Sequence, residues 1–449
     1  MISRRQAMMS TLFGTGLVGL RALATGLPAA FLMNPRKALA DMPDSAACGT
    51  PQYVIFNTLG SGDPINANVP GMYLDKNITH PTDPTMAATS LTLSGQTYTA
   101  AAPWASLPQA VLDRTTFWHM MTDTPIHPKE PAVLSLMDAT YKDEMFPSLL
   151  AQQLSPCLGC IQPYPISLGA STPAEALSYQ GQALPIMPPI ALQATLTNPA
   201  SNPLTGLQAL RDQTLNGING QPGIYDLYKN YANTAQKAYI DSMIASQTQV
   251  RNISQTLLSN LSSIKDNTAA SQILAAITLI QMNVSSVIAI RIPFGGDNHR
   301  DIALASETTE TVAGVASIAS LMSQLASAGL QDKVSFVTLD VFGRTVGPVN
   351  TDGRQHNPNH QVSLTIGKPF KGGVIGGVTT VGNDYGCMNV DPSSGAGTMS
   401  TSGTISAVNT LAAFGQTVLA AVGTPAAAIQ QQITVAGQTS LAVVKAALA

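Results

Sequence analysis

Histidines and carboxylates recur in this chain where expected strands end. Five of the six histidines lie in strand-end or loop segments: His119, His127, His299, His356 and His360. Asp63 and Asp297 accompany them. Imidazole nitrogens and carboxylate oxygens are ligands for a borderline divalent cation such as zinc, which polarises an ester oxygen and activates a nucleophile. The alternative, that each histidine only makes hydrogen bonds within its own loop, stays open at this point.

Four apolar segments are expected to be the buried strands that position these groups, at residues 53–59, 116–121, 286–292 and 333–342. The polar residues follow in the same order: Asp63 after the first, His119 near the end of the second, Asp297 and His299 after the third, and Asp340 to Arg344 at the fourth. Ligand sites of parallel sheets lie at the carboxyl ends of their strands. We therefore expect these side chains to meet at one edge of a sheet.

Helices are expected at residues 130–153, 224–264, 269–282, 307–328, 405–422 and 426–448. Residues 160–203 are rich in Pro and Gln and lack periodicity, which predicts a long excursion over the surface. Apolar strands that alternate with helices predict an α/β protein, an α/β/α sandwich with a mostly parallel central sheet. Residues 41–449 would form one domain, with a largely helical or irregular insertion around 155–283.

The first 40 residues have the order of a signal peptide: Arg4 and Arg5, an apolar stretch over 11–33, and a small-x-small site that ends at Ala40. The arginine pair is typical of twin-arginine signals, so the export machinery of that pathway is an expected partner and the mature chain is expected to be periplasmic or secreted. The alternative is a permanent N-terminal anchor, which Arg21 within the apolar stretch disfavours. No stable transmembrane span is expected in the mature chain.

The composition bears on the class of partner. Charged residues make up 10% of the chain and the net charge is −3. The mature part has no cluster of Lys and Arg, and nucleic-acid binding needs clustered cations that neutralise phosphates. Nucleic acid is therefore not an expected partner.

Four cysteines, Cys48, Cys157, Cys160 and Cys387, form an even set, which in an exported protein favours disulfides. Prolines and loop residues surround the Cys157–Cys160 pair, so we interpret it as a structural staple of a loop. A redox pair or half of a zinc site is the alternative. Cys48 with Cys387 is the second bridge we consider.

Several motifs form a series: the twin-arginine leader, Gly60-Ser-Gly-Asp63, Gly295-Gly-Asp297-Asn-His299, the helix before Gly329-Leu-Gln-Asp-Lys-Val334, Phe342-Gly-Arg344-Thr345, Gly353-Arg-Gln-His356-Asn-Pro and Lys371-Gly-Gly-Val-Ile-Gly-Gly377. This series resembles the exported bacterial family called domain of unknown function 1501, which is similar in fold to the alkaline phosphatase and sulfatase superfamily. The resemblance is dense over about 290–377, thin over 53–73 and absent over 154–283.

The resemblance implies an alkaline phosphatase-like fold with a metal site at the carboxyl edge of the sheet. Carried over by motif, the ligands would be Asp63, Asp297, His299 and His356. The cation would be zinc first, with manganese or calcium as alternatives, or none at all.

The resemblance also implies catalytic groups. A nucleophilic hydroxyl near a helix N-terminus would be that of Thr122 or Thr124. Arg344 would clamp the anionic ester with its planar guanidinium group. The alternative for Arg344 is a buried ion pair, with Asp340 as its partner.

Two positions depart from the family's pattern and leave two functions open. Val341 and Gln355 stand where acidic residues are usual in the family, which predicts weak or altered metal binding. One expected function is a metal-dependent hydrolase of phosphate or sulfate esters, with a small anionic ester as substrate. The other is a catalytically degenerate protein on the same fold that binds a cell-envelope component or has a structural role.

Overall fold

The computed structural model describes residues 49–169, 176–197, 217, 222–232, 237, 255–347, 353–435 and 441–449. The expected signal peptide at 1–40 and Cys48 lie outside the described residues. Much of the helix expected over 224–264 does so too.

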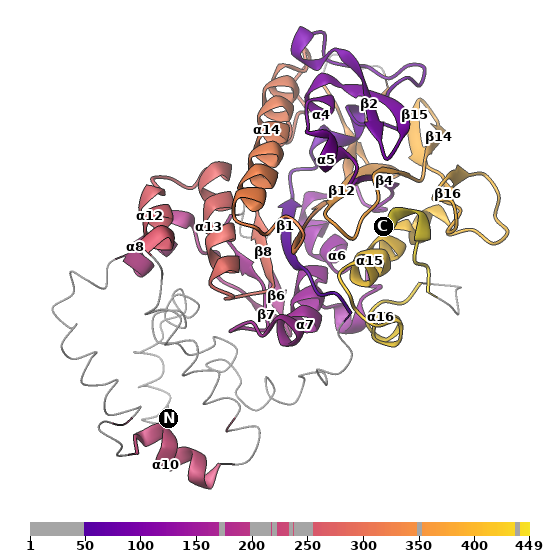
Figure 1. Cartoon of the computed structure of the whole chain (residues 1–449). Coiled ribbons are helices and arrows are strands. Elements are labelled where there is room, and N and C mark those ends of the chain that lie inside the picture. Colours follow the sequence, from indigo (N-terminus) through magenta and orange to yellow (C-terminus); the bar gives the residue numbers. More distant parts are fainter. Residues whose placement is uncertain are drawn as a thin grey trace, which may run out of the picture.

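A seven-stranded sheet forms the centre of the molecule (Figure 1). Its strands stand in the order β13-β4-β12-β9-β1-β8-β5. Their bounds are β1 Tyr53–Leu59, β4 Thr115–Met120, β5 Ile166–Ser167, β8 Val287–Ile290, β9 Val334–Asp340, β12 Gln361–Ile366 and β13 Gly373–Ile375. Among these seven, β12 runs against the others, since it pairs antiparallel with β4 and β9 while the remaining neighbours pair in parallel. The expected α/β class with a mostly parallel central sheet is confirmed.

Smaller elements surround this sheet. Five strand pairs form antiparallel ribbons: β2 Ala88–Leu93 with β3 Gln96–Ala101, β6 Ser178–Tyr179 with β7 Gln182–Ala183, β10 Gly343–Arg344 with β11 His356–Asn357, β14 Val378–Val381 with β15 Asp384–Cys387, and β16 Asn389–Val390 with β17 Gly397–Thr398. The α-helices are α4 Ala102–Ala105, α5 Gln109–Leu112, α6 Glu130–Leu134, α7 Phe146–Leu158, α8 Pro189–Thr197, α10 Ile224–Tyr231, α12 Gln255–Ser263, α13 Ala269–Gln281, α14 Ala305–Ser327, α15 Thr410–Ala421 and α16 Ala426–Gln432. Single 3₁₀ turns are η2 Pro64–Ala67, η3 Pro84–Met86, η4 His127–Lys129, η5 Tyr141–Asp143, η7 Ala407–Asn409 and η8 Lys445–Ala447.

The central strands are apolar along their length because both faces of the sheet are covered. In β1, Ile55 and Leu59 belong to one buried apolar cluster, whereas Val54 and Phe56 belong to another. Successive side chains of a strand point to opposite faces, so the two clusters are the cores on the two faces. Helices α13 and α14 pack into the first core, and α7 and α15 pack into the second (Figure 1).

The expected helices at 269–282, 307–328 and 405–422 are confirmed as α13, α14 and α15, although α15 begins only at Thr410. In the described part of the chain, no helix combines the length and the hydropathy that crossing a bilayer requires.

The single helix expected over 130–153 is wrong, because the chain breaks it into α6 and α7. The three consecutive residues 136–138, which lie between them, have φ angles of 54°, 52° and 66°. These angles belong to the left-handed region, which a right-handed helix does not contain. Pro147, in the first turn of α7, marks the second start, since proline suits a first helical turn.

Two other expected helices are shorter than the sequence indicated. The helix expected over 426–448 ends with α16, because Ile433 is extended, with a φ angle of −133°. Within 224–264 the described residues form α10 and α12, and α10 ends at Tyr231 because the next residue is extended.

The surface excursion expected over 160–203 is wrong for the described residues. Ile166 and Ser167 form β5, the edge strand that pairs with β8. Apolar side chains of this stretch are buried, among them Leu168, Leu177 and Leu192. The stretch around 155–283, expected as an insertion, thus contributes β5 to the central sheet and α13 to its cover.

Neither expected disulfide forms, because Cys160 and Cys387 are free thiols. Cys157 Sγ faces a carbonyl oxygen of its own helix at 3.4 Å, whereas Cys160 Sγ lies 3.1 Å from Asn283 Oδ1. Cys157 is disulfide-bonded, but its partner is not Cys160, which is a free thiol. Cys387 is buried against the carbonyl oxygen of His119.

His119 and His360 form a buried chain of hydrogen bonds. Their rings stack with centroids 5.2 Å apart, and His119 Nδ1 lies 3.0 Å from His360 Nε2. His119 Nε2 contacts Pro70 O at 2.9 Å, and His360 Nδ1 contacts Asn66 Nδ2 at 3.2 Å. Because the Asn66 amide donates and the Pro70 carbonyl accepts, two neutral rings satisfy every bond in the chain. Hydrogen bonds within the protein therefore account for all four ring nitrogens of these two histidines, although the partners lie far from them in the sequence.

Acid should destabilise the fold through this pair. Burial lowers the pKa of His119 from 6.5 to about 4, and burial also lowers the pKa of His360. The unfolded chain then binds protons that the folded chain does not, so stability should fall as the pH drops from 6.5 towards 4. The loss should reach about 1.4 kcal/mol per pH unit for each histidine. Urea unfolding across this range should show a shallower loss for His119→Gln.

Val362→Ala is the matched control, because Val362 is the buried β12 partner of His119 and carries no titratable group. It should lower the unfolding free energy at every pH and leave the slope unchanged. A slope for His119→Gln equal to that of the unmodified chain would contradict the assignment.

Candidate metal centre

Four strands, β1, β4, β8 and β9, run in the same direction and end at the same edge of the sheet. The segments that follow them carry most of the polar residues singled out in the sequence. The turn 60–63 follows β1, the segment 121–127 follows β4, the loop 291–304 follows β8, and the β10–β11 ribbon follows β9. The convergence of these segments builds the site.

Four side chains from three of these segments form a group that could hold a metal ion: His127, Asp297, His299 and His356. One ligand atom of each lies within 4.8 Å of the others. His127 lies on η4, Asp297 and His299 in the loop after β8, and His356 on β11. The side chain of Asp297 is 51% exposed, so the group opens to solvent.

Two of the histidines are oriented by backbone carbonyl groups. His127 Nδ1 lies 2.7 Å from Gly60 O, and His356 Nδ1 lies 2.5 Å from Pro125 O. A carbonyl oxygen only accepts, so each Nδ1 must carry the proton and donate it. In the neutral rings, each Nε2 is then left with a bare lone pair. Metal-binding histidines are held in the same way, with the second ring nitrogen donating to an oxygen.

The bare nitrogens point into the group. His127 Nε2 is buried without a hydrogen-bond partner among the described residues and lies 3.6 Å from Asp297 Oδ2. His356 Nε2 lies 2.7 Å from His299 Nε2. Burial first, and then the nearby charges of Arg344 and the other two histidines, lower the pKa of His356 to about 4, so its ring is neutral. Two lone pairs at this distance repel each other unless a proton or a cation lies between them.

Arg344 lies beside this group with its side chain fully buried. Its Nη2 donates to Ser61 O at 2.5 Å and to Asp297 Oδ1 at 2.7 Å, and its Nε donates to Gly62 O. Its Nη1 lies 3.4 Å from His299 Nε2. The ion pair of Arg344 is therefore with Asp297, where the sequence suggested Asp340.

Arg344 sets the charge state of Asp297. Burial by itself raises the pKa of this carboxyl group, but the hydrogen bond and the charge of Arg344 outweigh burial, and His127 and His299 add to them. The resulting pKa is lowered, so Asp297 is ionised at neutral pH. The group thus offers three imidazoles and one carboxylate.

An aromatic ring supports the histidines. Phe342, which is fully buried, lies with its ring centroid 4.9 Å from that of His127 and 4.3 Å from that of His356. Gly62 passes directly over this ring with a φ angle of +64°, and a Cβ atom there would lie 2.1 Å from a ring carbon of Phe342. The turn after β1 therefore requires glycine for two reasons, its backbone conformation and its contact with Phe342.

The structure brings together three of the four ligands named from the sequence, namely Asp297, His299 and His356, and it places Arg344 against them. His127, which the sequence analysis named among the five strand-end and loop histidines but not among the four ligands carried over by motif, completes the group. The position of His127 shortly after the end of β4 was the only indication in the sequence. The residue types do not indicate the turn that brings this side chain to Gly60.

Asp63 lies outside this group. It is buried, and its carboxylate accepts from the Ser61 hydroxyl and from the amide of Phe294. These bonds join the turn after β1 to the loop after β8. Burial raises the pKa of Asp63, although both hydrogen bonds oppose this shift.

The other proposed residues have different surroundings. Thr122 and Thr124 are buried, at 1% and 4% exposure, on the segment that also carries Pro125 and His127. Val341 belongs to an apolar core and offers no ligand atom. Asp340, next to it, is also buried; burial first and then the charge of Asp63 raise its pKa well above the ordinary value.

Comparisons with known proteins add no family assignment: no protein-family model matches this chain, and no curated protein matches it.

The contact between Gly62 and Phe342 can be tested by substitution. Gly62→Ala should lower the unfolding free energy by about 1–2 kcal/mol for the left-handed backbone and by a further ~1–3 kcal/mol for overpacking against the ring. Gly382→Ala is the matched control, because Gly382 has a φ angle of +60° and open space around its Cβ position. Urea unfolding should show only the backbone cost in the control. Equal losses in the two variants would show that Phe342 makes no difference.

Proposed function

We propose that His127, Asp297, His299 and His356 hold one zinc ion. The observation that carries this proposal is the pair of backbone carbonyls that fix Nδ1–H on His127 and His356. Their bare Nε2 atoms then point into the group, that of His127 towards Asp297 and that of His356 towards His299. Histidines that only make hydrogen bonds within their own loops would have no reason to direct their ring nitrogens to one point. Three imidazoles and a carboxylate are a donor set that suits zinc, with manganese or calcium as weaker candidates.

The geometry of the group fits a cation in three respects. His127 Nε2 is a buried lone pair without a hydrogen-bond partner among the described residues. His299 and His356 bring two ring nitrogens within 2.7 Å of each other, so two imidazoles direct a ligand atom to the same point. Asp297 is half-exposed, so that a cation and a substrate could enter from solvent.

We propose further that this centre hydrolyses phosphate or sulfate esters. Zinc would supply Lewis acidity that polarises an ester oxygen. Arg344 Nη1, which donates to no backbone carbonyl of the described residues, would hold a second oxygen of the anion. The hydroxyl of Thr122 or Thr124, both on the segment that carries His127, would attack phosphorus or sulfur and displace the alcohol of the ester. Water would then cleave the bond to threonine, release phosphate or sulfate and restore the hydroxyl.

The motif resemblance supports the same assignment from the sequence side. The family with domain of unknown function 1501 and its likeness to alkaline phosphatases predict a metal centre at this edge of a mostly parallel sheet. The arginine pair at residues 4 and 5 supports export through the twin-arginine pathway. We propose on these grounds that the protein acts in the periplasm or as a secreted protein.

A second function is favoured by one observation. Most of the donors of Arg344 are already used, on the carbonyls of Ser61 and Gly62 and on Asp297, and Val341 is part of an apolar core. A protein that binds a cation without turning over an ester, and that recognises a cell-envelope component, would have the same features. The hydrolase would turn over an ester, whereas the binding protein would not.

Zinc binding can be measured directly. The purified protein should bind close to one equivalent of zinc in a titration against a chelating indicator. His127→Ala and His356→Ala each remove a ligand, so affinity should fall by more than the roughly 10–100-fold loss typical of outer-shell changes.

His80→Ala is the control for this measurement. His80 stacks on Tyr73 at 3.8 Å and lies outside the group, so its loss should leave zinc affinity unchanged. If His80→Ala and His127→Ala weaken binding equally, the four residues named here do not form the site.

Turnover separates the two functions. The zinc-loaded protein should hydrolyse an aryl phosphate or an aryl sulfate ester, lose this activity on chelation and regain it when zinc is added. His356→Ala should be inactive at zinc concentrations that saturate the unmodified chain, and His80→Ala should be active. Stoichiometric zinc without hydrolysis of either ester would exclude the hydrolase and leave the binding protein.

A further inference from the structure

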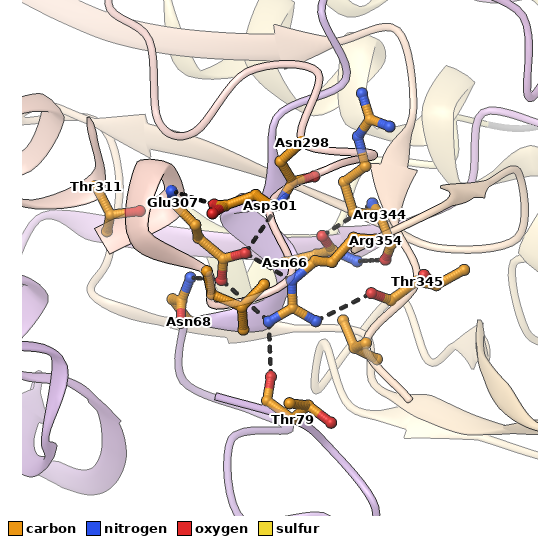
Figure 2. A network of polar contacts seen from close by, with 12 residues as sticks. Asn66, Asn68, Thr79, Asn298, Asp301, Glu307, Thr311, Arg344, Thr345 and Arg354 are labelled. Carbon is orange, nitrogen blue, oxygen red and sulfur yellow. Dashed lines mark hydrogen bonds and ion pairs between the residues drawn. The ribbon is translucent and has the colours of Figure 1, made fainter. Parts of the chain in front are cut away.

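A buried polar network is centred on Glu307 and Arg354 (Figure 2). Glu307 stands in the first turn of α14, and Arg354 stands two residues before His356 of β11. Both side chains have no exposed surface. Arg354 Nε donates to Glu307 Oε2 at 2.6 Å, and Arg354 Nη2 donates to Glu307 Oε1 at 3.0 Å, which makes a planar two-bond pair.

The remaining hydrogen-bonding groups of the pair reach further segments. Arg354 Nη1 donates to Thr345 O at 3.0 Å, and Nη2 donates to Thr79 O at 2.6 Å. The carboxylate of Glu307 also accepts from the amide groups of Asn68 at 2.8 Å and Asn298 at 3.0 Å. One carboxylate therefore joins three segments of the chain, as Figure 2 shows.

These partners are neighbours of the metal group in sequence. Asn298 lies between Asp297 and His299, and Thr345 follows Arg344. The two loops also touch directly, because Gly353, with a φ angle of +78°, packs so closely that a Cβ atom would lie 2.5 Å from Asn298 O. The loop after β8 and the ribbon after β9 are thus held at a fixed separation by contacts that include no ligand atom.

A buried ion pair of this kind adds little to stability, because the cost of removing two charges from water offsets most of their attraction. What the pair does determine is geometry, since its two parallel bonds tolerate little displacement. We propose that Glu307 and Arg354 are positioning residues that set the separation between Asp297 with His299 on one side and His356 on the other. This inference rests on the proposed zinc site.

Two buried asparagines provide a matched test. Asn298→Ala and Asn68→Ala each remove one amide bond to Glu307, from side chains that are 4% and 0% exposed. Only Asn298 lies in the loop that carries ligands. Zinc titration of the purified full chain should show an affinity about 10-fold lower for Asn298→Ala and changed by no more than about twofold for Asn68→Ala. Urea unfolding should show similar losses of stability for both.

A double variant separates positioning from a purely structural role. Glu307→Gln leaves Arg354 buried without a countercharge, and adding Arg354→Met removes that charge, so stability should recover in the double variant. Zinc affinity should stay at least about 10-fold low, because the two-bond connection between the loops is gone. Asp332→Asn, which breaks the exposed pair with Arg114, should leave zinc affinity unchanged.

The outcomes distinguish the two proposals. Zinc affinity that recovers together with stability in the double variant, or falls equally in both asparagine variants, would overturn the positioning role while the zinc site stands. Failure of the unmodified chain to bind zinc would overturn the proposed site and the positioning role with it.

Discussion

Three consecutive backbone carbonyl groups in the turn after β1 hold the candidate metal centre in place. Gly60 O orients His127, and Ser61 O and Gly62 O accept from Arg344. Backbone carbonyls in a tight turn cannot rearrange without moving β1, which is buried between two parallel neighbours. The side chains of the site come from loops, but their attachment to the turn after β1 restricts their movement relative to the sheet. Gly62 allows this turn, because any side chain there would meet the ring of Phe342.

Polar bonds between loops connect the segments that follow β1, β8 and β9. Asp63 joins the turn after β1 to the amide of Phe294 after β8, and Asn66 bonds both backbone groups of Arg344 after β9. Glu307 and Arg354 join the same loops. Each of these groups is buried, and a buried polar group that loses its partner costs about 1–3 kcal/mol.

The sequence predicted the strands and the ligand-bearing loops because these depend on local pattern. A continuous run of apolar residues predicted the bounds of β1. The Asp297-Asn-His299 motif follows the end of β8, where a site at the carboxyl edge of the sheet is expected. Features that depend on tertiary contacts were missed. The three left-handed residues 136–138 break a helix without glycine or proline, and β5 is only two residues long. His127 reaches the site through a turn whose course depends on Gly60, so residue types alone could not assign it.

The charge of the group bears on which ligand it would recognise. Imidazole ligands bring no negative charge to a cation, and the single carboxylate already shares Oδ1 with the cation of Arg344. A divalent cation held there would keep most of its positive charge, whereas a site with several free carboxylates would neutralise it. Arg344 adds a second fixed positive charge on the same side, with its Nη1 next to His299. Positive potential in a partly buried site attracts anions more strongly than it would in water. Val341 and Gln355 are uncharged and add no negative charge at this edge of the sheet, so the fixed charges of the site favour an anionic ligand over a neutral one.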